Sequence, residues 1–227
     1  MSQVVAFKSP IGDLKWVVYN GEGKENLSGR MKYQSDLVLP VDSEECKNLK
    51  AAIDAFWEDG RPAGLPAKKP AKSLGYRLEK EPVLDEDGNK QYGDDGKVVS
   101  KETGNMVFTF STDTTYPSGD PKIINIFNSK GNKVDLGGKK IGNGSRGQLS
   151  GAMGIYTVKD AKGKTVIDGG VTLYLNSIRL VKFVEFSGEE AWDEADEEGG
   201  WTGEGETNDW NGETGQETTG SKATPRL

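Results

Sequence analysis

The last 41 residues of the 227-residue chain, Ser187 to Leu227, limit how much of it can fold. Twelve carboxylates stand there against two basic residues, so the segment carries a charge of −10. It contains no Val, Ile, Met or Phe, and therefore cannot bury enough apolar surface to offset the entropy lost on ordering. This composition predicts a disordered acidic tail over 187–227. Folded structure is then confined to residues 1–186, which carry +3 because the whole chain carries −7.

The chain has no histidine and a single cysteine, Cys46. The absence of histidine excludes serine- and cysteine-type catalytic triads, histidine-assisted acid–base chemistry and nearly all zinc sites. One cysteine cannot form an internal disulfide, which fits a reducing compartment. No run of eighteen apolar residues and no signal-like N-terminus occurs. We therefore expect a protein that is not an enzyme, needs no cofactor, does not enter a membrane and stays in a cytoplasm.

Short alternating or apolar runs predict a mainly β body. The strands are expected over 4–8, 14–19, 30–40, 106–111, 122–128, 148–159 and 170–186. A turn is expected over Ser9-Pro10-Ile11-Gly12, between the first two strands. In the last strand the apolar pattern changes phase near Asn176-Ser177, which predicts a one-residue bulge. Bulged, strongly coiled strands favour a small closed barrel.

One amphipathic helix is expected after Pro40. Asp42 with Glu45 three residues later matches a capping box, and Gly60 ends the apolar pattern. The apolar stripe predicts a helix that covers one end of a sheet, with the lone cysteine buried in it rather than reactive. The stripe consists of Cys46, Leu49, Ile53, Phe56 and Trp57.

Residues 79–104 form an acidic insertion. Its Asp-Gly turns at 87–88 and 95–96 predict a protruding hairpin. Its aspartates do not follow the spacing of an EF-hand, because Gly88 comes too soon after Asp85. The clustered carboxylates leave a metal-dependent nuclease as an alternative, although no pair of them converges on adjacent strands.

Aromatic residues recur beside basic ones in the body, as a groove for single-stranded nucleic acid requires. Cations follow the phosphates, and ring faces stack on unpaired bases. Each tyrosine taken alone is more typical of a core or a sheet surface. The basic stretch 61–73 is either a solvated linker or an arm that contacts phosphates, and the glycines of 139–146 do not form a P-loop. The candidate DNA-binding residues are Arg30, Lys32, Tyr33, Lys68, Lys69, Tyr116, Lys122, Lys130, Lys139, Lys140, Arg146, Tyr156 and Lys159.

Several segments, in the same order along the chain, resemble the single-stranded-DNA-binding proteins of podovirus-type phage replication. The resemblance implies an OB-type five-stranded barrel with a capping helix, which binds single-stranded DNA without sequence preference in replication, recombination and repair. It also implies a host cytoplasm as the location. The segments are Gly29-Arg30, Lys68-Lys69-Pro70, Ser129-Lys130-Gly131, 141–145, Ile155-Tyr156, 171–181 and 188–194.

The resemblance further implies that Tyr156 stacks on a base, that Arg30 contacts DNA and that the tail recruits the phage DNA polymerase and helicase-primase. The tail departs from the family because it ends in Leu227 rather than an aromatic residue. The composition leaves open a tail that only keeps the protein soluble, a homodimer bridged by tails, and an OB-like module for protein or saccharide. The tail residues expected at a partner are Glu189, Glu190, Trp192, Asp193, Glu194, Trp201 and Trp210.

Overall fold

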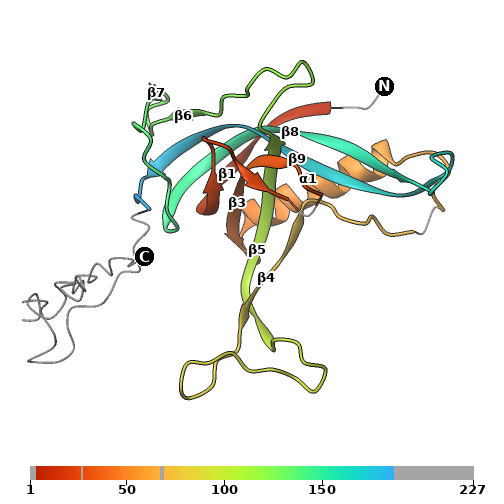
Figure 1. The fold of residues 1–227 in the computed structure, drawn as a ribbon, viewed down its shortest axis with the longest axis horizontal. Helices are drawn as coiled ribbons and strands as arrows, with labels where there is room; N and C mark the ends of the chain where they lie inside the picture. The colour runs from red at the N-terminus through yellow and green to blue at the C-terminus, as the bar shows by residue number, and fades with distance from the viewer. Residues whose placement is uncertain (1–3, 27, 67–68, 187–227) are drawn as a thin grey trace, which may run out of the picture. The chain divides into compact units, whose positions relative to one another are not determined.

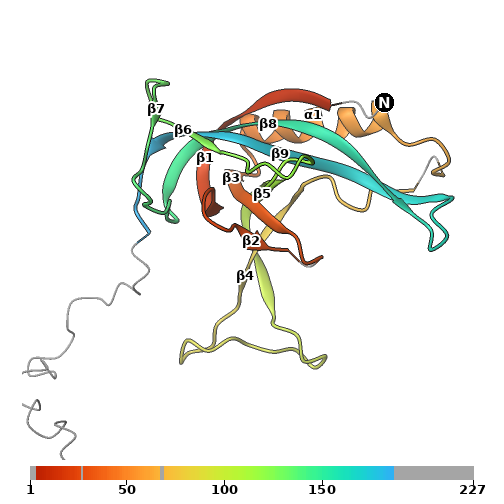
Figure 2. The same ribbon diagram turned by 45° about the horizontal axis from the view of Figure 1, so that its top comes forward.

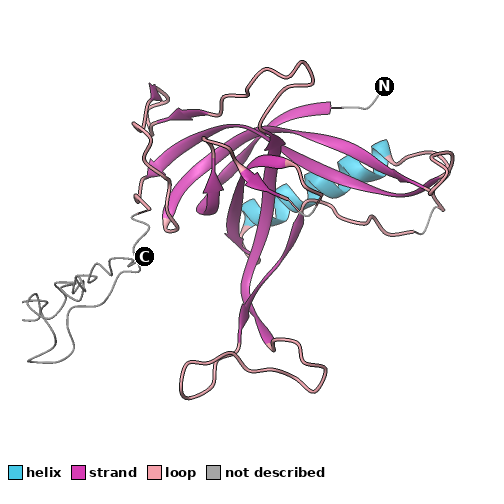
Figure 3. Cartoon of the chain, in the orientation of Figure 1, coloured by secondary structure: helices cyan, strands magenta, loops and turns pink. Residues whose placement is uncertain are grey.

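The computed structural model describes residues 4–26, 28–66 and 69–186 (Figure 1). Strands dominate these residues and a single helix accompanies them, which confirms the prediction of a mainly β fold (Figure 3). No helix in the described part is long and apolar enough to span a membrane. The elements are β1 (Val4–Val18), β2 (Lys24–Glu25), β3 (Met31–Pro40), α1 (Glu44–Gly60), β4 (Tyr76–Pro82), β5 (Ser100–Asp113), β6 (Asn125–Phe127), β7 (Lys133–Val134), β8 (Ser145–Lys159) and β9 (Val166–Lys182).

Five long strands pair into a closed ring. β1 pairs antiparallel with β3 and with β8, β3 pairs antiparallel with β5, and β8 pairs antiparallel with β9. A parallel contact between Phe110 of β5 and Leu173 of β9 completes the ring. This arrangement, with one helix beside it, confirms the predicted OB-like fold.

The hydrophobic core lies inside this ring. Successive side chains of a strand point to opposite faces, so one face of each long strand lies toward the interior. The ring of Phe7 packs on that of Phe110 with 5.6 Å between their centroids. Burying one such side chain stabilises the fold by about 1.5–3 kcal/mol, which makes the interior the main source of stability. The side chains that are almost completely buried include Leu14, Leu37, Phe108, Phe110, Leu149, Leu173, Leu175 and Ile178.

Helix α1 covers one end of the ring with the predicted apolar stripe, all five members of which are buried. Its N-cap differs from the prediction by one residue. Ser43, not Asp42, caps the helix, because the Ser43 Oγ accepts a hydrogen bond from the Cys46 backbone N–H at 3.1 Å. The Ser43 N–H in turn donates to the Pro40 carbonyl at 3.1 Å. This turn after β3 places Ser43 at the helix start.

Strand β1 does not break at Ser9–Gly12, so the predicted turn is wrong. Lys8 pairs with Ser150 and Ile11 with Gln148, which leaves a bulge between them. The buried Ser9 hydroxyl accepts a hydrogen bond from the Leu149 N–H at 2.9 Å and so takes the place of a backbone partner. Proline is tolerated at a bulge because no ladder donor is needed there.

The predicted bulge near Asn176 is confirmed. Ser150 pairs with Ser177 and Gly151 with Leu175, so Asn176 has no partner on β8. At this point the backbones come so close that a Cβ on Gly151 would lie 1.8 Å from the Tyr174 carbonyl oxygen. The residue opposite the bulge must therefore be glycine.

The acidic insertion is a hairpin of β4 and β5 that projects from the ring (Figures 1 and 2). Its outer part folds into two turns, at Asp85–Asn89 and Gly93–Lys97. The Asp85 carboxylate accepts hydrogen bonds from the backbone N–H groups of Asp87 and Asn89 at 3.0 and 2.8 Å. The Asp95 carboxylate accepts from the Lys97 N–H at 3.1 Å in the second turn, so Asp85 and Asp95 serve the turn geometry.

Glu79, at the base of this hairpin, makes the stability of the fold sensitive to acid. Burial alone would raise the pKa of its carboxyl group, but hydrogen bonds from Lys15, Asn105 and Thr103 outweigh burial and lower the pKa to about 2. A depressed pKa contributes stability above the unfolded value near 4.5, and this contribution is lost as the pH falls toward 2.

We expect Glu79 to contribute about 2 kcal/mol above pH 5, after allowance for solvent screening. Urea unfolding between pH 6 and pH 2 should give a flatter acid limb for Glu79→Gln than for the parent chain. Glu81→Gln is the matched control, because Glu81 is exposed and pairs with the exposed Lys101. Equal acid limbs for the parent and Glu79→Gln would contradict this expectation.

Candidate nucleic-acid interface

Four of the predicted DNA-binding residues come together where β3 begins and β5 ends. The Lys32 Nζ lies 2.9 Å from the Asp113 carboxylate on the neighbouring strand. The Lys122 Nζ lies over the Tyr116 ring, 5.2 Å from its centroid, and donates to the Thr112 hydroxyl. The hydrogen bond from Lys32 lowers the pKa of Asp113, and the charges of Lys122 and Arg30 add to this effect. These residues thus form one basic cluster around a carboxylate.

Tyr33 does not belong to this exposed cluster. Its side chain is only 6% exposed and lies in the hydrophobic core. Its hydroxyl donates to the Gly21 carbonyl at 3.0 Å. The alternation of β3 places Tyr33 on the inner side with Leu37, so its ring is mostly covered by the core. Its side chain also lines the β6–β7 groove described below, and its contact with DNA stays a prediction.

The other predicted cations lie apart from the cluster, and three of them hold carboxylates. Lys139 pairs with Glu185 at 2.7 Å, Arg146 with Asp13 at 3.1 Å, and Lys69 with Asp168 at 3.6 Å. Neutralised cations attract phosphates less, because the paired carboxylate repels the same anion. Lys130 lies in the β6–β7 turn, Lys140 lies before β8, and Lys159 ends β8. The predicted residues therefore do not form a single site.

Some predicted residues lie outside the part of the chain that the structure describes. They are Lys68 and the tail residues Glu189, Glu190, Trp192, Asp193, Glu194, Trp201 and Trp210.

Tyr156 is half-buried near the end of β8. It pairs with Gly170, and a Cβ on that glycine would lie 2.7 Å from the tyrosine hydroxyl. Burial, followed by the charge of Asp168, raises the pKa of Tyr156. The ring therefore rests on the bare backbone of β9, and its stacking role stays a prediction.

A cleft that the sequence did not reveal lies beside the end of β1. Trp16 stands in it with 61% of its surface exposed. Its φ angle of 54° is the only positive one at a non-glycine position in the described ranges. Such a conformation costs about 1–3 kcal/mol and is typical of functional sites. The backbone N–H of Trp16 donates to the Asn143 side-chain oxygen at 3.1 Å, which fixes the backbone at this position.

This Trp16 cleft, of about 540 Å³, combines rings with cations. Phe186 is 53% exposed, and its N–H donates to the Lys140 carbonyl at 3.0 Å. Lys24 stands opposite Lys32 in the β2–β3 pair, which links the cleft to the basic cluster. The side chains that line the cleft include Trp16, Glu22, Lys24, Gln34, Lys140, Asn143 and Phe186.

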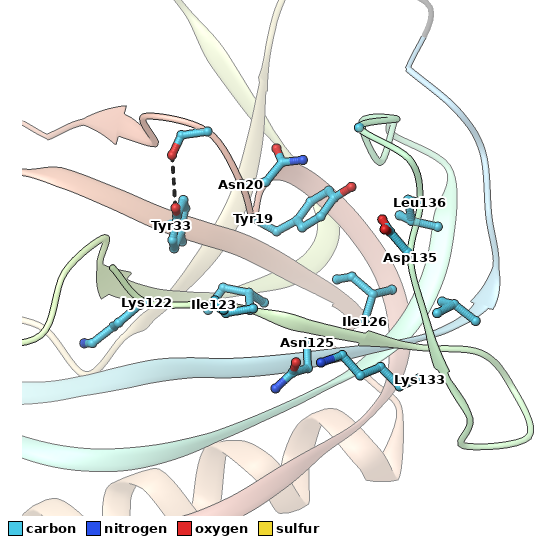
Figure 4. Close-up of a pocket in the computed structure, with 14 residues that line it drawn as sticks. Tyr19, Asn20, Tyr33, Lys122, Ile123, Asn125, Ile126, Lys133, Asp135 and Leu136 are labelled. Atoms are coloured by element: carbon cyan, nitrogen blue, oxygen red, sulfur yellow. Dashed lines mark hydrogen bonds between the residues drawn. The ribbon is translucent and has the colours of Figure 1, made fainter. Parts of the chain in front are cut away.

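A second hollow, the β6–β7 groove, adjoins the Trp16 cleft (Figure 4). It has a volume of about 650 Å³ and shares Tyr19, Asn20 and Gly21 with the cleft. The Tyr19 hydroxyl donates to the Lys139 carbonyl at 2.6 Å. Burial, and then the nearby Asp135, raise the pKa of Tyr19. Lys122, Ile123 and Lys133 line the groove, so the basic cluster opens into it.

Trp16 could have been found by the pattern that selected the tyrosines, because it follows Lys15 directly. The predicted strand over 14–19 concealed it, since a regular strand would have placed the ring on an ordinary sheet face. The pairing of β1 with β3 shifts register between Lys15 and Val18, and this irregularity exposes the ring. Among the described residues, no group of three or more Asp, Glu or Cys side chains is arranged to hold a metal ion.

No protein-family model matches the chain, and no curated protein sequence matches it. Among solved structures, it is similar to gp2.5, a single-stranded DNA-binding protein encoded by bacteriophage T7. The identity is 18% over 88% of this chain and 100% of that chain, with a TM-score of 0.49. It is also similar to the single-stranded DNA-binding protein from bacteriophage Enc34 in complex with ssDNA. There the identity is 12% over 78% of this chain and 86% of that chain, with a TM-score of 0.45.

Proposed function

We propose that the chain binds single-stranded DNA without sequence preference, in the Trp16 cleft and the adjoining β6–β7 groove. The observation that carries this proposal is the exposed Trp16 ring, held at a positive φ beside Lys24, Lys140 and Phe186. Stacking of one base on such a ring contributes about 1–3 kcal/mol. Lysines around the two hollows supply the charge that a phosphate backbone requires.

The chemistry of these hollows favours single strands over duplex. A duplex hides the base faces in its stack, whereas a single strand offers them to Trp16 and Phe186. Every base has such a face, so stacking tolerates any sequence. Gln34 and Asn143 are amide side chains in the cleft and can bond to bases or sugars as neutral groups. We infer a role in the protection of single strands during phage DNA replication, recombination and repair.

A fluorescence titration with poly-dT tests this function. Stacking on Trp16 should quench tryptophan emission, and the quenching should be smaller in Trp16→Phe. If Arg30, Lys24, Lys122, Lys133 and Lys140 neutralise five phosphates, log K should fall against log salt with a slope of about −3.5. An OB-like module for protein or saccharide would show no affinity for poly-dT and little salt dependence. That result would contradict the proposal.

The acidic tail extends the proposal to partners. Phe186 lies in the Trp16 cleft, and the first tail carboxylates, Glu189 and Glu190, follow within four residues. Four residues span at most about 14 Å, so the start of the tail can reach the cleft lysines. We infer that the tail competes with DNA for this site. When DNA displaces it, the tail becomes free to recruit the phage DNA polymerase and helicase-primase through its carboxylates and tryptophans.

A further inference from the structure

A third hollow crosses the outer face of the sheet, on strands that the proposed cleft does not use. It has a volume of about 300 Å³ and lies over four neighbouring strands, β1, β8, β9 and β6. Lys8 pairs with Ser150, which pairs with Ser177. In the next row, Gln148 pairs with Arg179, which pairs with Phe127. We call this hollow the outer groove; it is lined by Lys8, Phe127, Gln148, Ser150, Ser177 and Arg179 together with Gly131.

The charge of the outer groove is uncompensated. No carboxylate lines it, and within the described residues neither Lys8 nor Arg179 forms an ion pair. Lys32, Lys139 and Arg146, by contrast, each hold a carboxylate. Two cations on the same small surface repel each other, and an anion between them would remove this repulsion.

Arg179 also has a donor that nothing satisfies. Its Nε is buried and has no hydrogen-bond partner among the described residues. A buried donor without a partner costs about 1–3 kcal/mol. The Nε itself is enclosed, but the side chain of Arg179 is half-buried and lines the groove, so the rest of its guanidinium can face a ligand there. The planar guanidinium matches the paired oxygens of a phosphate, and charge-assisted hydrogen bonds of this kind are the strong ones.

The polar neighbours of Arg179 complete an anion site. The bulge at Asn176 places Ser177 opposite Ser150, so two hydroxyl-bearing residues share the floor of the groove. The Gln148 amide is not free for a ligand, because its Nε2 donates to the Ser9 carbonyl at 2.7 Å. Phe127 supplies an apolar surface beside the donors. This set of groups fits one phosphodiester with its sugar or base against the ring.

We propose that the outer groove binds a backbone phosphate of single-stranded DNA beyond the part held in the Trp16 cleft. The inference rests on the proposed function and adds a second contact to it. β1 connects the two sites, because Lys8 and Trp16 lie eight residues apart on this strand, at most about 27 Å. Lys130 is exposed and adjoins Gly131 of the outer groove. This predicted DNA-binding residue would therefore lie along the proposed course of the strand.

The test compares oligothymidylates of increasing length on the full chain. Short oligomers should occupy the Trp16 cleft alone, and long ones should reach both sites. With long oligomers, Lys8→Gln and Arg179→Gln should each weaken binding by about tenfold, the value of one charge-assisted contact. Each should also reduce the salt slope by about 0.7. With the shortest oligomers both variants should bind like the parent chain.

Lys182→Gln is the matched control, because this exposed lysine lies on β9 but outside the outer groove. It should bind long oligomers within about twofold of the parent, since distant exposed charges are screened by salt. Lys8 is exposed, so Lys8→Gln should fold normally. The test therefore still holds if Arg179→Gln loses stability.

A second arm separates DNA from free phosphate as the ligand. Amide NMR signals of Ser150 and Ser177 should shift on addition of long oligothymidylate. A shift with inorganic phosphate but none with DNA would overturn the proposal and assign the groove to free phosphate. Variants that bind long oligomers like the parent would also overturn it and leave the proposed function intact. A parent chain that binds no oligomer of any length would overturn both.

Discussion

Replacement of Trp16 by alanine is expected to weaken the binding of single-stranded DNA by about 1–3 kcal/mol, or roughly 5- to 150-fold. The ring is 61% exposed and faces a cleft that holds Lys24, Lys140 and Phe186. Its removal deletes a stacking surface but leaves the cations, so the salt slope should stay unchanged. The measurement is the anisotropy of a labelled oligothymidylate at several salt concentrations.

The positive φ of Trp16 provides a second variant that separates binding from folding. Glycine adopts a φ of 54° without strain, whereas alanine at this position would be strained as tryptophan is. Trp16→Gly should therefore fold at least as stably as Trp16→Ala while it loses the same affinity. Tyr92→Ala is the matched control, because Tyr92 is a similarly exposed ring on the acidic hairpin and should not affect binding. Parent-like affinity in both Trp16 variants would remove the cleft from the binding surface.

Local patterns predicted the parts of this fold that depend on residues close in sequence. The helix followed from the spacing of Cys46, Leu49 and Ile53, because a period of 3.6 residues places them on one face. The bulge at Asn176 followed from the change of phase in the apolar pattern after Leu175. A strand with one buried face can shift its pattern by one residue only where a bulge inserts an extra residue. The closed ring of strands was predicted less directly, because it was inferred only from the bulged and coiled character expected of the strands.

Features that depend on partners far along the chain could not be predicted in this way. Ser9-Pro10 has the composition of a turn, yet the Leu149 N–H from another strand keeps β1 extended. The neutralisation of Lys32 and Arg146 arises from Asp113 and Asp13, which only strand pairing brings near. The basic residues in the sequence are therefore a larger set than the cations that the described residues leave without a carboxylate partner.

The exposure of Trp16 and the lack of an ion pair at Arg179 within the described residues have the same origin. Trp16 is displayed because β1 shifts its register against β3 there. Arg179 faces an outer groove whose walls come from β1, β6 and β8. A single strand cannot indicate which of its faces other strands will leave open. The strongest functional candidates in the structure were for this reason absent from the predicted set.

Removal of residues 187–227 is expected to tighten the binding of single-stranded DNA by about tenfold at low salt. A segment attached to the protein acts on a nearby site at about millimolar effective concentration. Non-specific binding of a nucleic acid has a dissociation constant of about 0.1 mM at its weak limit, and we take this value for the tail. A tail with a charge of −10 that occupies the cleft with this constant would therefore weaken DNA binding by about tenfold. The gain should vanish as salt screens the tail.

The matched control keeps the length of the tail and removes its charge, with all twelve carboxylates changed to amides. If competition is electrostatic, this chain should bind DNA as tightly as the truncated one, because loss of charge and loss of the segment then have the same effect. If the amide tail still weakens binding, its tryptophans and not its carboxylates occupy the cleft. Gel filtration of the three chains shows whether the tail acts on its own cleft or on that of a neighbouring molecule. Exchange of tails between neighbours would make the full chain elute as a dimer and the truncated chain as a monomer. Equal affinity of all three chains at low salt would show that the tail leaves the Trp16 cleft open to DNA.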